Sequence, residues 1–147
     1  MSGQGEGAFA IRSFERADTE AVVALWRACG LVRPWNDPYK DIERKLGEQP
    51  ELFLVGCIDG AVVASAMVGF DGHRGWVYYL AVVPIRQRLR IGHSMMARAE
   101  QLLFERGCPK LTLMVRSENA SVIAFYRRLG FAEDKVMVLG KRLIPDL

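Results

Sequence analysis

The segment from Asn119 to Phe131 combines a possible proton donor with a helix that could position it. It reads NASVIAFYRRLGF, and its apolar side chains recur at helical spacing, at Ala120, Ile123, Ala124 and Leu129. Asn favours the start of a helix and Gly its end, so the helix is expected to stop at Gly130. A phenol with a pKa of about 10 can donate a proton, which makes Tyr126 a candidate general acid. Tyr126 could equally be a core aromatic residue whose hydroxyl reaches the surface.

A second segment, from Gln87 to Gly92, leads into the longest predicted helix, residues 91–107. Successive backbone N–H groups at a helix N-terminus bind anions such as a pyrophosphate. Gly is favoured there where the backbone must approach the anion or take a positive φ angle. The loop is therefore a candidate phosphate site, although its arginines would also suit a solvated basic turn.

Both segments resemble motifs of the GCN5-related N-acetyltransferase (GNAT) family. Residues 119–131 are similar to its N-x-x-A-x-x-F-Y-x-x-L-G-F signature. Residues 87–92 are similar to its Gln/Arg-x-x-Gly-x-Gly/Ala loop, with Arg90 in place of the central Gly. The chain resembles small uncharacterised bacterial members of this family, from Phe9 to about Leu143.

The resemblance implies an enzyme that transfers the acetyl group of acetyl-CoA to a primary amine by direct attack in a ternary complex. Arg90 could add charge to the phosphate loop, or it could crowd the loop and weaken binding. A catalytically weak acyl-CoA-binding or sensor module of the same fold therefore stays an alternative.

The resemblance also implies which residues bind the acetyl donor. In the family, the strand before the loop pairs with the pantetheine arm through main-chain groups, and an amide there polarises the thioester carbonyl. The loop amides bind the pyrophosphate, and the signature helix contacts the arm. Carried over by position, the predicted cofactor-binding residues are Leu80, Ala81, Val82, Gln87, Arg88, Leu89, Arg90, Ile91, Gly92, His93, Asn119 and Tyr126.

The resemblance does not identify the general base. Some family members carry a Glu on the strand before the signature helix, but residues 113–116 read LMVR and place Met114 there. The local candidates are Asp71, His73 and Glu43. A His near its reference pKa is a good base at neutral pH. A turn Asp, however, more often makes an Asx-turn, and a turn His is more often solvated.

The acceptor amine needs a pocket across the cleft from Tyr126. A Trp held between prolines, as in residues 33–38, is a rigid amphipathic platform, although Trp35 could instead plug the end of the core. We predict that the pocket uses the polar and aromatic residues left after core and cofactor positions are assigned, which are Trp35, Asn36, Asp71 and Arg74. The expected acceptor is a small-molecule or peptide amine.

Hydrophobic periodicity and turn residues predict the elements that position these groups. Helices are expected near residues 18–30, 39–47, 91–107 and 119–129, and strands near 9–14, 52–58, 61–70, 76–83 and 111–115, with two short ones around 131 and 136–139. The fold class is α/β (α+β), with one mixed sheet of six to seven strands and about four helices. The family resemblance adds that this sheet is splayed. Residues 1–7 are expected to be a flexible N-terminus and residues 8–147 a single domain.

Composition excludes several other classes of protein. The net charge of +3 over 147 residues is too small and too evenly spread to indicate nucleic-acid binding. No apolar stretch is long enough to span a membrane. The three cysteines lack a C-x-x-C spacing, so we expect reduced thiols in a cytoplasmic protein. We expect no metal, and either a monomer or a homodimer.

Overall fold

The computed structural model describes residues 7–87 and 90–146, which form five strands and four α-helices. The strands are β1 (Phe9–Ser13), β2 (Phe53–Ile58), β3 (Ala61–Phe70), β4 (Gly75–Val82) and β5 (Leu111–Thr112). The helices are α1 (Thr19–Ala28), α2 (Pro38–Leu46), α3 (Ile91–Glu105) and α4 (Ala120–Arg128). Short 3-10 turns cover Arg16–Asp18, Pro50–Leu52 and Pro84–Arg86. Arg88 and Leu89, which we predicted to bind the cofactor, lie outside the described residues.

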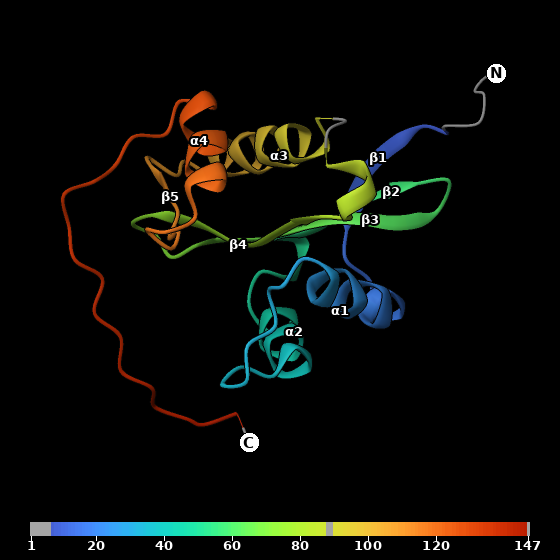
Figure 1. Cartoon of the computed structure of the whole chain (residues 1–147), viewed down its shortest axis with the longest axis horizontal. Coiled ribbons are helices and arrows are strands. Elements are labelled where there is room, and N and C mark those ends of the chain that lie inside the picture. Colours follow the sequence, from blue (N-terminus) through green and yellow to red (C-terminus); the bar gives the residue numbers. More distant parts are fainter. Residues whose placement is uncertain (1–6, 88–89, 147) are drawn as a thin grey trace.

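The strands form one mixed sheet in the order β1-β2-β3-β4-β5 (Figure 1). The first four pair antiparallel, and β5 joins β4 in parallel. The turn between β2 and β3 is Asp59-Gly60, and both residues have positive φ angles, of 52° and 80°. Two-residue hairpins favour this conformation. Helix α3 makes the crossover that a parallel neighbour requires, so the predicted mixed sheet is confirmed.

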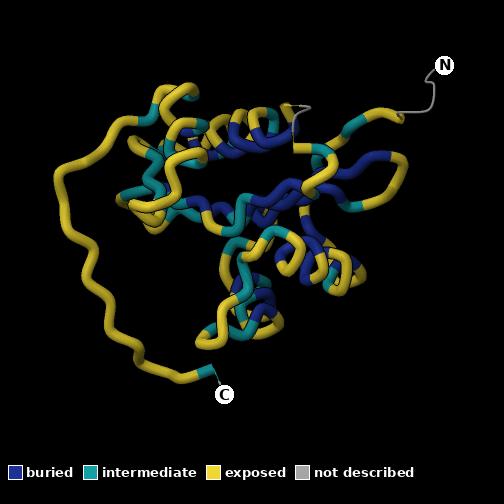
Figure 2. The backbone as a smooth tube through the Cα atoms, viewed as in Figure 1, coloured by how far each residue is buried: buried dark blue, intermediate teal, exposed yellow. Residues whose placement is uncertain are grey.

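The sheet separates two layers of helices and two hydrophobic clusters. Helices α1 and α2 pack on one face, and α3 and α4 pack on the other (Figure 1). The α1/α2 cluster is centred on Trp26, Ile42 and Phe53, and the α3/α4 cluster on Met95 and Met96. Figure 2 shows buried strands between helices whose outer sides are exposed. Each helix therefore contributes one apolar stripe to its own cluster.

Strands β4 and β5 separate soon after they meet. Their register joins only Gly75 to Leu111 and Trp76 to Thr112, so the strand predicted over 111–115 is shorter than expected. From Val77 onwards, β4 has no strand partner on that side within the described chain. This divergence gives the sheet the splayed form that we predicted, and it leaves backbone polar groups of β4 available to another molecule.

The strands predicted around residue 131 and over residues 136–139 are not formed, so the sheet of the described chain has five strands rather than six to seven. Residues 132–146, here called the C-terminal tail, run as an extended and largely exposed segment away from the sheet (Figures 1 and 2). Apolar, β-branched composition favours a strand, but a strand also needs a neighbour to bond with. The tail finds none among the described residues.

Candidate functional site

Strand β4 contains a β-bulge in the stretch beyond Trp76, where it no longer pairs with β5. This side of β4 is here called the opening between β4 and β5. Between two regular pairs, Tyr79 and Leu80 together oppose the single residue Ala66 of β3. Tyr79 has a left-handed φ angle of 55°, which is uncommon for a residue other than Gly. The Tyr79 side chain joins the α1/α2 cluster, whereas Leu80 joins the α3/α4 cluster. A bulge bends its strand and increases the local twist. The backbone groups of residues 80–82, which follow the bulge along the opening, therefore face a different direction from those that precede it.

Side-chain contacts hold this bulge in place. The buried Ser65 hydroxyl donates to the Tyr79 carbonyl oxygen at 2.7 Å and accepts from Trp26 Nε1 at 2.9 Å. The Trp26 and Tyr79 rings stack with their centroids 3.7 Å apart. The left-handed conformation costs a residue with a side chain roughly 1–2 kcal/mol. The stacking and the two buried hydrogen bonds offset that cost, because each buried bond avoids an unpaired polar group.

Asp41 of α2 is a candidate residue that we did not predict from the sequence. Its carboxylate accepts from the Tyr79 hydroxyl at 2.6 Å and from Arg44 at 3.1 Å. Burial and the neighbouring carboxylate raise the pKa of Tyr79, so this phenol keeps its proton at neutral pH. Helical periodicity was the available signal, since Asp41 adjoins Ile42 on the buried face of α2.

The predicted phosphate loop ends at the N-terminus of α3, where backbone N–H groups have no acceptor among the described residues. The first hydrogen bond within α3 runs from the Ser94 N–H to the Arg90 carbonyl oxygen, at 3.1 Å. The N–H groups of residues 91–93 therefore have no partner within the helix, and they have none elsewhere in the described chain. Arg90 has a left-handed φ angle of 60°, and its guanidinium lies 3.3 Å from His93 Nε2. Backbone donors and basic side chains thus meet at one point, which suits a phosphate group.

Gln87 and Gly92, the two positions that match the family loop, both have structural contacts. The Gln87 side chain donates to the Val82 carbonyl oxygen at 3.0 Å and ties the loop to the end of β4. Gly92 lies inside α3, where an added Cβ would come within 3.3 Å of the Phe125 ring of α4. Gly92 therefore allows α3 and α4 to approach closely, and it is Arg90 that takes the positive φ angle.

Tyr126 of α4 is only 9% exposed and lies in the α3/α4 cluster. Its ring makes edge contacts with Phe125 and Phe131, at centroid distances of 5.1 Å and 5.5 Å. Burial raises the pKa of Tyr126 to about 12, so the hydroxyl is a proton donor at neutral pH. Asn119 occupies the N-cap position of α4 as predicted, but its side chain does not cap the helix.

Asp71, His73 and Arg74 form the turn between β3 and β4. One Asp71 oxygen accepts from the backbone N–H groups of Arg74 and His73, at 2.8 Å each, and the other accepts from Trp76 Nε1 at 3.2 Å. These bonds, that from Arg74 foremost, lower the pKa of Asp71. The carboxylate therefore has the Asx-turn role that we considered as an alternative, and the exposed His73 lies beside it.

The other predicted residues lie on the α1/α2 side of the molecule. Glu43 is exposed and pairs with Arg16 at 2.5 Å, so it points away from the sheet. Trp35 is 53% exposed, and Asn36 Oδ1 accepts from Arg142 of the C-terminal tail at 2.6 Å. Their connection lies apart from the β3–β4 turn in Figure 1, and no hydrogen bond joins the two segments in the described chain. The structure does not bring the predicted acceptor residues together.

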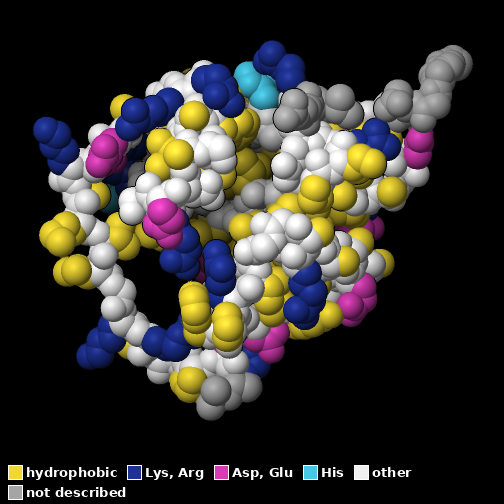
Figure 3. Space-filling view, viewed as in Figure 1, with side chains coloured by type: hydrophobic (Ala, Val, Ile, Leu, Met, Phe, Trp, Pro, Cys, Tyr) yellow, Lys and Arg dark blue, Asp and Glu magenta, His cyan; other side chains and the backbone are white. Residues whose placement is uncertain are grey.

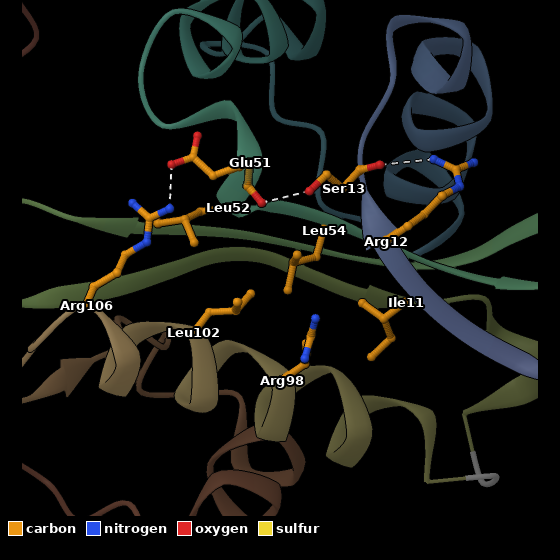
Figure 4. A pocket seen from close by; sticks show the side chains of 9 residues that line it. All are labelled: Ile11, Arg12, Ser13, Glu51, Leu52, Leu54, Arg98, Leu102 and Arg106. Carbon is orange, nitrogen blue, oxygen red and sulfur yellow. Dashed lines mark hydrogen bonds and ion pairs between the residues drawn. The ribbon is translucent and has the colours of Figure 1, made fainter.

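Two shallow pockets border α3. One, of about 220 Å³, lies between α3 and α4 and is lined by His93, Met96, Ala97, Glu100, Arg128 and Leu129. The other, of about 230 Å³, lies between α3 and strands β1 and β2 (Figure 4). The second pocket includes the Arg106–Glu51 ion pair and none of the predicted site residues. The candidate site for the acetyl donor therefore lies on the α4 side of α3, next to the pocket between these two helices.

Basic side chains lie over α3 and α4 but are not confined to them. Figure 3 shows Lys and Arg there and also along the C-terminal tail and over the lower part of this face, and α4 ends with the exposed Arg127 and Arg128. Within residues 7–87 and 90–146, no three His, Cys, Asp or Glu side chains form a group that could hold a metal ion. In the same residues, no helix has the length and apolar character needed to cross a membrane.

Comparison with known proteins identifies the family. The model of the "Acetyltransferase (GNAT) family" matches residues 18–131, a range that holds the β4 bulge, the start of α3 and Tyr126. The chain therefore belongs to the GNAT family, and the resemblance seen in the sequence is confirmed.

Relatives and solved structures agree with this assignment. Acetyltransferases of Yersinia enterocolitica and Sodalis glossinidius are 50% and 51% identical over 136 and 137 residues, which is 92% of this chain and 96% of each relative. An Escherichia coli N-acetyltransferase for an alanine of a ribosomal protein has a TM-score of 0.73 at 25% identity, over 87% of this chain and 80% of that one. The enzyme AAC(6')-Iy, solved with a bisubstrate CoA analogue, has a TM-score of 0.77 at 17% identity, over 93% of this chain and all (100%) of that one. The last likeness shows the fold alone.

Proposed function

We propose that this protein transfers the acetyl group of acetyl-CoA to a primary amine. The observation that carries the proposal is that β4 has no strand partner on its β5 side beyond Trp76, and that the N–H groups of residues 91–93, at the start of α3, have no partner among the described residues. A long ligand with an anionic end and an amide-containing arm fits such an arrangement. Backbone donors of α3 suit the anionic end, and the open edge of β4 suits the arm.

The residues around the opening fit the acetyl donor. Arg90, His93 and Arg128 surround the start of α3 and would favour phosphate groups. The backbone of residues 80–82 borders the opening beside the bulge and would bind the arm, as in the family. A backbone N–H there would stabilise negative charge that develops on the thioester oxygen, which is often a large part of acyl-transfer catalysis.

Tyr126 would stabilise the sulfur atom of the cofactor as it leaves the acetyl group. The neutral amine attacks the thioester carbon, the carbon–sulfur bond breaks, and the sulfur takes the electron pair. A thiol in water has a pKa of about 8.5, well below that of a buried phenol. Desolvation in the same cluster raises the pKa of a thiolate as well, which narrows the difference. Tyr126 would therefore donate a hydrogen bond to the departing sulfur and stabilise the negative charge that develops on it. The proton that the amine releases after its attack would then convert the thiolate to the thiol, so Tyr126 keeps its own proton.

The amine would approach from the α1/α2 face. The Asp41 carboxylate lies on that face, bound to the hydroxyl of Tyr79 at the bulge. A carboxylate there would attract a cationic amine and accept its proton, directly or through water. Asp71 and His73 remain candidates for the same task, and the acceptor is a small-molecule or peptide amine.

Titration calorimetry with acetyl-CoA, followed by a thiol-release assay over polyamines, amino sugars, lysine and short peptides, tests the proposal. We expect binding of acetyl-CoA and thiol release that depends on an amine. Binding without release for every amine would favour the alternative of an acyl-CoA-binding module. No binding at all would mean that the fold serves another purpose.

A further inference from the structure

Two aromatic side chains of β4 lie outside both hydrophobic clusters of the described chain. Trp76 is half-buried and Tyr78 is 44% exposed. Their rings are nearly parallel, with an interplanar angle of 12° and centroids 6.4 Å apart. Val77, the residue between them, is buried in the α3/α4 cluster, so both rings lie on the opposite face of the sheet, that of α1 and α2. This pair of rings is here called the aromatic platform.

A charged carboxylate borders the aromatic platform. Asp71 Oδ2 accepts from Trp76 Nε1 at 3.2 Å. Backbone hydrogen bonds, that from Arg74 foremost, lower the pKa of Asp71, so the carboxylate is ionised at neutral pH. Burial and, to a smaller extent, this carboxylate raise the pKa of Tyr78, so Asp71 also lies near the second ring. Aromatic faces attract cations, and a neighbouring carboxylate strengthens that attraction.

Arg74 and Lys45 are cations near the platform, and each has partners of its own. The Arg74 guanidinium donates to the His73 carbonyl oxygen at 3.1 Å, within the β3–β4 turn. Lys45 of α2 approaches β3 beside the platform, where Glu51 and Glu48 favour its charged form. The platform therefore offers exposed ring surface beside an ionised carboxylate.

The platform leads along β4 to the proposed site of acetyl transfer. Tyr79, the next residue, joins the α1/α2 cluster and binds the Asp41 carboxylate on the same face of the sheet. Residues 80–82, which would border the acetyl donor, are two to four positions beyond Tyr78. At about 3.3 Å per residue this separation is roughly 7–13 Å. A straight aliphatic chain that runs back along β4 from the reacting amine therefore reaches the platform.

We propose that the aromatic platform and Asp71 bind the second ammonium group of an aliphatic diamine, whose first amine is acetylated. This inference rests on the proposed function and narrows its acceptor to amines with two positive centres. The ring faces and the carboxylate attract the second ammonium group, and the aliphatic chain between the two nitrogens packs along β4. A monoamine of the same length lacks the charged contacts.

Tetramethylammonium, a cation that cannot be acetylated, tests the binding without turnover. The NMR signal of the Trp76 indole N–H, assigned by its loss in Trp76→Phe, should shift with this cation and stay unchanged with tert-butanol, a neutral molecule of similar shape. Tyr78→Leu removes one ring and should weaken the binding by about 2–10-fold, whereas Tyr78→Phe should retain it. Phe104→Leu is the matched control, because Phe104 is an exposed aromatic residue on α3, and it should change nothing.

Equal shifts with tert-butanol, or equal affinities in Tyr78→Leu and the unchanged protein, would refute the cation site whether or not the protein is an acetyltransferase. Circular dichroism confirms that each variant is folded. Tyr78→Val replaces Tyr78→Leu if the latter is not.

Steady-state kinetics tests whether the platform selects the acceptor. The kcat/KM for diaminoheptane should exceed that for heptylamine, whereas diaminopropane, which is too short to reach the platform, should have no such advantage over propylamine. Tyr78→Leu should raise the KM for diaminoheptane by about 2–10-fold and leave kcat and acetyl-CoA affinity unchanged. Equal kcat/KM values for diaminoheptane and heptylamine would contradict the proposal. Binding of tetramethylammonium without acetylation of any amine would refute the proposed function, and the diamine with it, rather than the binding of a cation.

Discussion

Replacing Arg90 by Gly tests whether the start of α3 is strained. Arg90 has φ and ψ angles of 60° and 20°, a conformation that costs a residue with a Cβ roughly 1–2 kcal/mol and costs Gly almost nothing. Against this gain, Gly makes the unfolded chain more flexible, by about 0.5–1 kcal/mol. The exposed contact with His93 contributes little. We therefore expect Arg90→Gly to raise the free energy of unfolding by about 0.5–1 kcal/mol.

Arg90→Ala is the matched control, because it removes the guanidinium but keeps the Cβ and hence the strain. Its free energy of unfolding should change by no more than about 0.5 kcal/mol. Urea denaturation of the three proteins under identical conditions measures both differences. Equal stabilities for the Gly and Ala variants, or a less stable Gly variant, would refute the strain argument.

Arg90→Gly also tests how Arg90 affects the binding of acetyl-CoA. If the backbone N–H groups of residues 91–93 bind the phosphate, Arg90→Gly should change acetyl-CoA affinity by less than about tenfold, or roughly 1.4 kcal/mol. Titration calorimetry provides the measurement. An affinity gain of about a hundredfold or more would show that the Arg90 side chain blocks the loop.

Further predictions concern catalysis and packing. Tyr126→Phe should lower kcat by about 10²–10⁴-fold with acetyl-CoA affinity nearly unchanged. Because burial raises the pKa of Tyr126 to about 12, the donor form persists, and kcat in a pH profile should show no fall from this group below about pH 10. Asp41→Asn should raise the KM for the amine or lower kcat, whereas the exposed-pair variant Glu43→Gln should change neither, in steady-state assays. Ser65→Ala leaves two buried polar groups unpaired and should lower the free energy of unfolding by about 2–4 kcal/mol in urea melts. Gly92→Ala gains about 1 kcal/mol of helix propensity, but its Cβ would lie 3.3 Å from the Phe125 ring, and overpacking costs about 1–3 kcal/mol, so the free energy of unfolding should fall by about 1 kcal/mol or less in the same melts.

The sequence predicted the elements whose signals are local. The spacing of Val22, Val23 and Trp26 predicted α1, and Asp59-Gly60 predicted the β2–β3 turn, because each depends on neighbouring residues alone. The tail shows the opposite case. Its composition favours a strand, but pairing depends on a distant edge, and the structure leaves residues 136–139 unpaired.

The candidate site was likewise predicted only where the signal is local in the sequence. The family motif singled out Tyr126, and the structure adds that it lies in the α3/α4 cluster, where burial raises its pKa and keeps the hydroxyl protonated. The bulge at Tyr79 was not visible in the sequence, because it follows from how two strands align. Glu43 and Asp41 both stay candidate bases. They are two residues apart on α2, about half a helical turn, so Glu43 lies on the exposed side while Asp41 lies next to the buried side.

The division of the core by the sheet has a consequence for how such a protein can diversify. Donor-side residues such as Tyr126 and Gly92 pack in one cluster, and Asp41 and Tyr79 belong to the other face. The effects of replacements in separate clusters on the free energy of unfolding should be additive, because residues of the two clusters share few contacts. A mutational library confined to α2 and the connection before it would therefore sample new acceptors while the donor side keeps its packing. In the proposed enzyme, selectivity for the amine can drift over generations without loss of the shared acetyl source.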